Sequence, residues 1–143
     1  MSPSLYFIDA NIPMYAVGKT HPLKQICLDI LEACADGRIN AITNSEVLQE
    51  ILHRYTALGE RRRAIEVAQL FMQVVPNVLP VTKEDISLAL NLHEEYARLT
   101  ARDAVHAAVM RNNKITHLIS ADEHFDEVNR IKRTDPTTFT RPL

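Results

Sequence analysis

Hydrophobic residues occur along this chain in two alternating patterns. Short runs that are apolar on both faces predict buried strands of a parallel sheet at residues 5–8, 39–42, 78–81 and 117–120. In the run at 78–81, Pro76 and Pro80 bracket Val78 and Leu79, which favours the edge of the sheet. Residues 131–133 can form a final strand.

Between these runs, apolar residues recur at spacings of three and four, which predicts amphipathic helices. Gly18, Gly37 and Gly59 are expected to end or follow three of them. The expected helices cover residues 11–17, 21–35, 45–58, 61–75, 83–99 and 101–111, with a short helical turn at 123–127 and an extended tail at 135–143.

Strands that alternate with helices predict an α/β sandwich around a mostly parallel sheet of about four or five strands. The length of 143 residues and the lack of a long linker suit a single domain over residues 1–143. In such folds ligands bind beyond the carboxyl ends of the strands. The residues that follow each strand are therefore the first place to look for chemistry.

Acidic residues occupy those places. Asp9 follows the first strand, Glu46 the second and Asp122 the fourth, while Asp103 begins the alanine-rich helix at 101–111. Carboxylates gathered at one sheet edge repel each other unless a cation lies between them. Oxygen ligands without a nearby cysteine suit Mg²⁺ or Mn²⁺, ions that can support phosphodiester cleavage.

Helix capping is the structural alternative for each of these acids. Asp9 can cap the helix that follows it, and Asp122 can lie in a polar turn. The Thr-x-x-acid spacing of a capping box occurs three times, in Thr43 with Glu46, Thr100 with Asp103, and Thr82 with Asp85. The residues around Asp85 give no indication of catalysis. The Thr-x-x-acid spacing alone therefore does not distinguish a capping residue from a catalytic acid.

Composition and charge narrow the function classes. Apolar residues make up 46% and charged residues 24%, as in ordinary globular proteins, and the net charge is −2. A nucleic-acid ligand would therefore need local basic patches or bound cations. No apolar run is long enough to span a membrane, and no secretory signal is evident, so the cytoplasm is expected. Cys27 and Cys34 are expected to pack on one helix without a disulfide.

Histidine and arginine residues are further candidates for the site. His106 follows Asp103 by three residues, so it either supports the site or packs as a structural histidine. Arg102, beside Asp103, is a candidate for a supporting role. The run of arginines at 61–63 can contact phosphates or form a solvated face.

Four segments together resemble the PIN-domain nucleases, and most closely the VapC-type toxins of toxin–antitoxin pairs. They are FIDAN at 7–11, SEVLQE at 45–50, ARDAVHAA at 101–108, and LISAD at 118–122 followed by Phe125-Asp126. Each motif is loose, but four in this order and at these separations are fairly specific. The resemblance covers nearly the whole chain.

This resemblance implies a three-layer α/β/α fold and endonucleolytic cleavage of RNA, often a structured RNA such as tRNA or rRNA. Asp9 and Asp103 would bind the metal directly, Asp122 would complete the site, and Glu46 would orient water or act as a ligand. Glu46 is preferred to Glu50 because it lies nearer the strand ends, whereas Glu50 is expected in a salt bridge. The implied supporting residues are Asn11, Ser120 and Asp126.

A VapC-type toxin implies a protein partner, the antitoxin, which would insert a segment into the acidic groove. The apolar faces of the helices at 47–55 and 61–75 are expected either to form a homodimer or to receive that antitoxin. No membrane partner is expected.

Two rival functions remain. A phosphatase or phosphotransferase of the haloacid-dehalogenase kind also begins with a strand and an Asp, but it needs a second Asp where this chain has Asn11. A non-catalytic binding module of the same fold is the other rival, although none of the four acids is missing. Metal-dependent RNA cleavage that disappears on Asp9→Asn would distinguish the nuclease from both rival functions.

Overall fold

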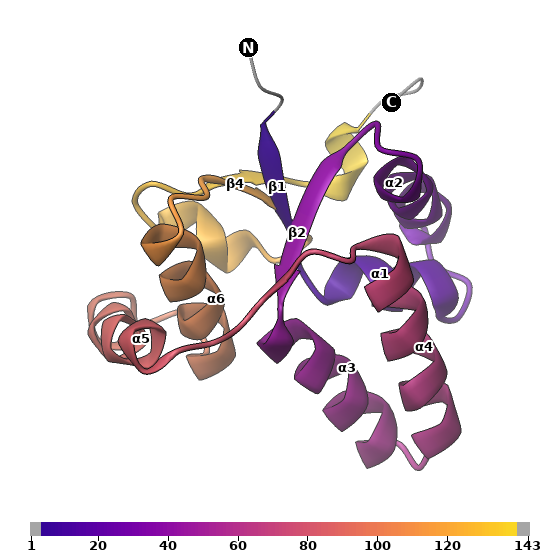
Figure 1. The fold of residues 1–143 in the computed structure, drawn as a ribbon, viewed down its shortest axis with the longest axis horizontal. Coiled ribbons are helices and arrows are strands. Elements are labelled where there is room, and N and C mark those ends of the chain that lie inside the picture. Colours follow the sequence, from indigo (N-terminus) through magenta and orange to yellow (C-terminus); the bar gives the residue numbers. More distant parts are fainter. Residues whose placement is uncertain (1–3, 140–143) are drawn as a thin grey trace.

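The computed structural model describes residues 4–139 and contains one five-stranded parallel sheet at its centre (Figure 1). The strand order is β3-β2-β1-β4-β5, so the first strand of the chain lies in the middle. The strands are β1 (Leu5–Ile8), β2 (Asn40–Asn44), β3 (Val78–Leu79), β4 (His117–Ile119) and β5 (Lys132–Thr134). The parallel sheet and the edge position of β3 agree with the sequence pattern.

Helices cover both faces of this sheet, which confirms the three-layer α/β/α sandwich. The helices are α1 (Asn11–Val17), α2 (Lys24–Ala35), α3 (Ser45–Ala57), α4 (Arg61–Val74), α5 (Lys83–Glu95) and α6 (Ala101–Asn112), with 3-10 turns η1 (Glu123–Glu127) and η2 (Pro136–Thr138). Helices α1, α2 and α4 pack together on one side, and α5 packs on α6 on the other (Figure 1).

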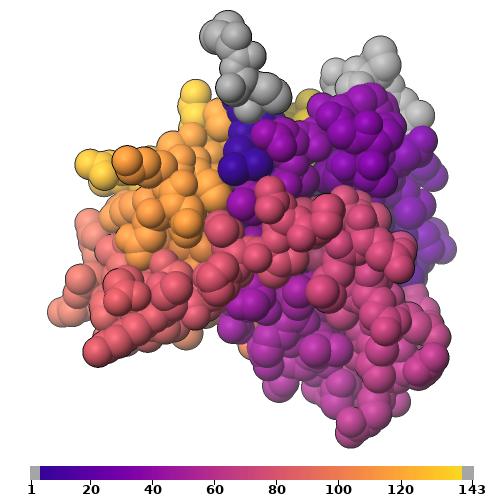
Figure 2. Space-filling model, viewed as in Figure 1, coloured from indigo at the N-terminus to yellow at the C-terminus, as the bar shows by residue number. Residues whose placement is uncertain are grey.

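Helix α3 has a special position because it begins at the carboxyl end of β2 and leads away from the sheet (Figure 1). It packs on α4 and also contacts α6. Gly59, with φ of +78°, makes the tight turn from α3 into α4. In the same view the outline of the molecule is indented between α5 and the α3–α4 pair (Figure 2).

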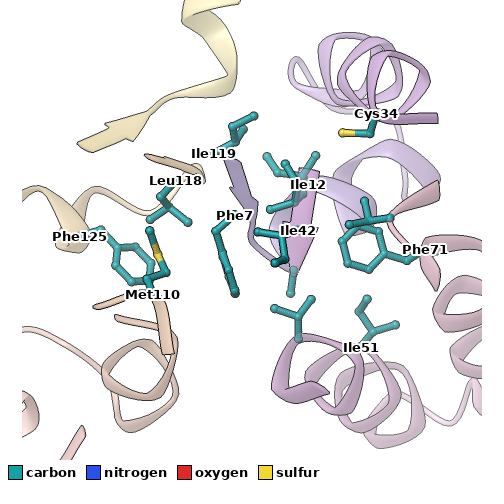
Figure 3. Close-up of a cluster of buried hydrophobic side chains, with 14 of the residues drawn as sticks. Phe7, Ile12, Cys34, Ile42, Ile51, Phe71, Met110, Leu118, Ile119 and Phe125 are labelled. Atoms are coloured by element: carbon teal, nitrogen blue, oxygen red, sulfur yellow. The ribbon is translucent and has the colours of Figure 1, made fainter. Parts of the chain in front are cut away.

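The core is apolar on both sides of the central strands (Figure 3). Phe7, Leu118 and Met110 are fully buried towards α6, whereas Ile12 and Phe71 fill the opposite side. Burial on both faces explains why the strands are continuous apolar runs rather than alternating ones.

The ends of several elements differ from the sequence expectation. Helix α2 begins at Lys24 rather than at residue 21, because His21 and Pro22 form a turn in which His21 Nδ1 accepts from Leu23 N. Helix α5 ends at Glu95 rather than at 99, because Tyr96 is extended and the chain must reach Thr100, the N-cap of α6.

Differences also occur at the short strands. β3 has only two residues because Pro80 cannot continue the ladder, and β5 lies one residue later than expected. The tail is not simply extended, since Asp135 caps the turn η2, and the part of the predicted tail at 140–143 lies outside the described residues. Within residues 4–139, no helix combines the length and hydropathy that crossing a membrane requires.

The two cysteines agree with the prediction. Cys27 and Cys34 are free thiols on α2, and both are buried. Burial raises the pKa of each thiol to about 12, so neither is a ready nucleophile.

Candidate active site

The carboxyl ends of β1, β2 and β4 meet at one edge of the sheet. Ile8 pairs in register with Ile119, and Asp9 N continues the ladder with a 3.1 Å hydrogen bond to Ile119 O. On the other side, Thr43 Oγ1 donates to Ile8 O at 3.1 Å. Asp9, Asn44 and Ser120 therefore emerge side by side.

Asp9 is the buried centre of this edge, with 4% of its surface exposed. Its Oδ2 accepts a 2.6 Å hydrogen bond from Ser120 Oγ, and its Oδ1 accepts one of 2.8 Å from Ala10 N. Burial raises the pKa of the Asp9 carboxyl, against the opposing effects of His106 and Ser120. Asp9 is not the N-cap of α1, because that position is Ala10 and has no side-chain cap.

The turn after β4 is tied to the same carboxylate. Asn11 Nδ2 donates to Asp9 Oδ2 at 3.3 Å and to Ser120 Oγ at 3.1 Å, while Asn11 Oδ1 accepts from Ala121 N at 3.2 Å. Ser120 Oγ also accepts a 3.0 Å hydrogen bond from Asp122 N. Asn11 and Ser120 thus fix the turn that carries Asp122 relative to Asp9.

Asp103 faces Asp122 from the first turn of α6. Thr100 caps that helix by accepting from Asp103 N at 3.1 Å, and Asp103 is 8% exposed. Burial, the neighbouring Asp122 and the charge of Asp9 together raise the pKa of Asp103 to about 8. Near neutral pH the Asp103 carboxyl therefore resists ionisation unless a cation compensates the local negative charge.

Glu46 is held by a cation of the protein itself. Its Oε1 accepts a 3.1 Å hydrogen bond from Arg102 Nε, and Arg102 Nη2 donates to Gln49 at 3.2 Å. The predicted capping box of Thr43 with Glu46 does not form, because the N-cap of α3 is Asn44 and the Thr43 hydroxyl is bonded to β1.

Glu50, one turn further along α3, points towards Asp9. Its Oε1 lies 3.6 Å from His106 Nε2, which in turn lies 3.9 Å from Asp9 Oδ1. The expected salt bridge is also present, with Arg54 Nη1 3.6 Å from Glu50 Oε2. Burial would raise the pKa of Glu50, but His106, Arg102 and Arg54 hold it below its usual value.

The proximity of Glu50 to Asp9 was missed because the sequence does not give the direction in which α3 leaves the sheet. The spacing of four placed Glu46 and Glu50 on one helix face, but only the packing of α3 on α6 decides which carboxylate turns inwards. His106 on α6 was the available signal, since it already shared a face with Asp103.

Asp126 forms an ion pair with Arg133. Arg133 Nε donates to Asp126 Oδ1 at 2.8 Å, and this pairing lowers the pKa of Asp126. Arg133 also donates to Asp135 Oδ2 and to Ser120 O, each at 2.9 Å. Arg133 thus braces the turn after β4 from the side opposite Asp9.

The donor atoms suit a divalent cation. Within residues 4–139, two groups have ligand atoms within 4.8 Å of one another: Asp9, Glu50 and His106 form one, and Asp103, Asp122 and His124 form the other. Asp9 and Asp103 are buried carboxyls with raised pKa values, and a cation between them would relieve the cost of ionising them. The acidic cluster can therefore hold a metal ion.

Comparisons with known proteins agree with this architecture. The sequence profile of the PIN domain matches residues 6–131. Ribonuclease VapC13 of Mycobacterium tuberculosis is 44% identical over 130 residues, covering 90% of this chain and 98% of that protein. Ribonuclease VapC7 of the same organism is 35% identical over 133 residues, covering 90% of each.

Solved structures show the same fold at low sequence identity. VapBC2 from Rickettsia felis, bound to a promoter DNA fragment, aligns over 92% of this chain and 98% of its own with a TM-score of 0.71 and 15% identity. FitAcB from Neisseria gonorrhoeae aligns over 94% and 99% with a TM-score of 0.70 and 12% identity. With its profile match, its full-length relatives and its fold, this chain belongs to the PIN-domain family and, within it, to the VapC ribonucleases.

Proposed function

We propose that this protein is a metal-dependent endoribonuclease that serves as the toxin of a type II toxin–antitoxin pair. The observation that carries the proposal is the gathering of the buried Asp9 and Asp103 with the half-buried Asp122, where burial of Asp103 and its two acidic neighbours raise the pKa of Asp103 to about 8. The relatives named VapC ribonucleases and the neighbours solved as toxin–antitoxin complexes support the same activity.

The proposed cofactor is Mg²⁺ or Mn²⁺, held by Asp9, Asp103 and Asp122. When bound by these carboxylates, such an ion would supply Lewis-acid chemistry, which polarises a phosphate oxygen and makes water a stronger nucleophile at neutral pH. Ser120 and Asn11 orient the Asp9 carboxylate through hydrogen bonds to its Oδ2. Ser120 at the end of β4 and Asn11 at the start of α1 thereby keep this carboxylate aligned for the reaction.

Helix α3 offers two candidates for the fourth acid of the site, Glu46 and Glu50. Glu46 remains the candidate from the sequence, and its pairing with Arg102 favours a role in holding that arginine for a phosphate of the substrate. The orientation of Glu50 towards Asp9 favours Glu50 as the fourth acid. We therefore add Glu50 to the proposed catalytic set.

RNA is the proposed substrate, with structured RNA such as tRNA or rRNA as the first class to test. The net charge of −2 means that attraction to RNA must be local. Arg102 and Arg54 lie beside the two glutamates of α3, and the arginines at 61–63 begin α4. These side chains are the proposed contacts to the phosphate backbone.

An antitoxin and a second copy of this chain are the proposed protein partners. Helices α3 and α4 and the turn between them expose large apolar side chains that a monomer leaves in water: Leu52, Leu58, Leu70 and Met72. We propose that this surface receives the antitoxin or forms the dimer. Light scattering that finds a monomer, with no partner retained on purification from the native host, would contradict this proposal.

The test compares three purified proteins: the wild type, Asp103→Asn and Asp85→Asn. Asp85 is the matched control, because it is also a buried acid three residues after a capping threonine. It bonds Asn112, at the opposite end of α6 from Asp103. Each protein is incubated with total RNA in Mg²⁺, Mn²⁺ or EDTA.

Cleavage by the wild type and Asp85→Asn, requiring metal and absent in Asp103→Asn, is expected. Cleavage that persists in Asp103→Asn and in EDTA would contradict the proposal, once contaminating nuclease is excluded. Hydrolysis of small phosphoesters in place of RNA would favour the phosphatase alternative. Tight RNA or protein binding without cleavage would favour the non-catalytic module.

A further inference from the structure

His106 presents a buried nitrogen to the acidic cluster without a hydrogen-bond partner. The side chain is 0% exposed, and Nε2 has no partner within hydrogen-bonding distance among the described residues. It faces Glu50 Oε1 at 3.6 Å and Asp9 Oδ1 at 3.9 Å. A buried polar atom of this kind usually has a functional explanation.

Two opposite explanations fit these distances. Ligands bound at about 2.1 Å to one metal ion lie about 3.0–4.2 Å apart, so Nε2 can be a metal ligand beside the two carboxylates. Alternatively, Nε2 can carry a proton and donate it towards the same oxygens. The position of the imidazole proton decides between them, and that position depends on what faces Nδ1.

Asn44 faces Nδ1, and its orientation is fixed by helix capping. Val47 N donates a 2.9 Å hydrogen bond to the Asn44 side chain, so the atom that it meets must be the amide oxygen. The remaining amide group, the NH₂ at Nδ2, then lies 3.1 Å from His106 Nδ1. Asn44 is fully buried, and turning its amide would abolish the cap of α3.

Because Nδ2 can only donate, Nδ1 of His106 must accept, and the proton of the neutral imidazole lies on Nε2. We propose that Asn44 and His106 are positioning residues that direct an N–H group at Glu50 and Asp9, so that His106 orients the carboxylates and is not itself a metal ligand. This inference rests on the metal site of the proposed function.

The arrangement has a consequence for the choice of metal. With His106 excluded as a ligand, the group formed with Asp9 and Glu50 offers only oxygen atoms, which suit Mg²⁺ and Mn²⁺ better than softer ions. Moving Glu50 by about 0.5 Å would bring Oε1 within hydrogen-bonding distance of Nε2. Hydrogen bonds in catalytic sites are often long before substrate and metal bind.

The decisive experiment measures the protonated nitrogen directly. Wild-type protein labelled with ¹⁵N-histidine is studied by NMR in EDTA and in Mg²⁺, and the His106 signals are assigned by their loss in His106→Gln. We expect the N–H to be on Nε2 in both conditions. A proton on Nδ1, or loss of the Nε2 proton when Mg²⁺ is added, would overturn the inference.

A second variant tests the role of Asn44. Asn44→Asp keeps a strong N-cap but replaces the donor facing Nδ1 by an acceptor. We expect Nδ1 of His106 to become protonated in this variant. An unchanged proton position would show that Asn44 does not set the tautomer and would overturn its part in the inference.

Mg²⁺ affinity, measured by calorimetry, tests the positioning role separately from activity. His106→Leu is expected to weaken Mg²⁺ binding by about 10- to 100-fold, whereas His106→Gln, which can place an amide N–H near the former Nε2, stays close to the wild type. Wild-type affinity in a folded His106→Leu would overturn the positioning role alone. Failure of the wild type to bind Mg²⁺ would instead overturn the proposed metal site and this role with it.

Discussion

Arg102 Nε donates a 3.1 Å hydrogen bond to Glu46 Oε1, and this contact joins the first turn of α6 to the first turn of α3. The partners lie 56 residues apart in the chain. The acid nearest the end of β2 is therefore neutralised by an arginine, while Glu50 faces His106 and Asp9.

This difference predicts unequal effects of two matched substitutions on the same helix. Glu50→Gln is expected to lower the rate of RNA cleavage by about 100-fold or more, because it removes a charge beside Asp9. Glu46→Gln should lower it by less than about tenfold, because it only loosens Arg102. Single-turnover cleavage of one RNA by both variants, with folding checked by circular dichroism, makes the comparison. The reverse order of effects would restore Glu46 as the fourth acid.

The parallel sheet and the gathering of acids at its edge could be predicted because both follow from local pattern. Strand runs such as 5–8 are apolar on both faces, Asp9 comes directly after a strand, and Asp122 lies in the turn that follows another. The partner of Glu46 could not be predicted, because it depends on how α3 crosses α6. The Asn44 cap could not be predicted either, because Thr43 is an equally good capping residue by sequence. Only the structure shows that the Thr43 hydroxyl instead donates to Ile8 O.

The 2.6 Å hydrogen bond between Ser120 and Asp9 predicts a coupled loss of stability and activity in Ser120→Ala. The substitution also removes the acceptor for Asp122 N and a partner of Asn11. We expect the free energy of unfolding to fall by about 1–3 kcal/mol and cleavage to fall by about tenfold. Urea unfolding and cleavage assays measure both. Ser45→Ala, at an exposed serine, is the control and should change neither.

The raised pKa of Asp103 predicts an unusual dependence of stability on pH in EDTA. The folded protein keeps this carboxyl protonated up to about pH 8, whereas an ordinary aspartate ionises near 3.8. Between these values the folded state binds more protons than the unfolded chain, so the free energy of unfolding falls as pH rises. The pKa of the Asp9 carboxyl is also raised, so the titration of Asp9 changes the stability in the same direction.

Asp103→Asn should therefore raise Tm at pH 8 by about 4 °C, the shift that roughly 1 kcal/mol produces in a domain of this size. The gain should shrink towards pH 4. Glu123→Gln, which removes an exposed acid next to the site, controls for the change of one net charge. An Asp103→Asn protein that is less stable than the wild type at pH 8 would contradict the prediction.

Added divalent metal should counteract this loss of stability at high pH in the wild type. A cation at the acidic cluster competes with protons for Asp9 and Asp103, so the rise of Tm on adding Mg²⁺ should be larger at pH 8 than at pH 6. At 100 times its dissociation constant the ion would contribute about 2.7 kcal/mol. Calorimetric scans of the wild type and Asp9→Asn test this, and an equal rise in both proteins would place the ion elsewhere.

The pairing of Asp126 with Arg133 predicts that Asp126 contributes little to cleavage, although it lies only four residues after Asp122. Its carboxylate accepts hydrogen bonds of 2.8 and 3.1 Å from the guanidinium, and its side chain is 52% exposed. Asp126→Asn should lower the cleavage rate by less than about fivefold, the most that 1 kcal/mol from an exposed ion pair allows. Asp122→Asn should lower it by about 100-fold or more.

Arg133→Gln separates a bracing role of the arginine from any role of Asp126. It removes the donor to Ser120 O, so the turn that carries Asp122 should loosen, and cleavage should fall further than in Asp126→Asn. Parallel cleavage assays of the three variants at saturating Mg²⁺ give the order. If Asp126→Asn abolishes cleavage while Arg133→Gln leaves it intact, Asp126 must leave Arg133 during catalysis and act as a fifth acid of the site.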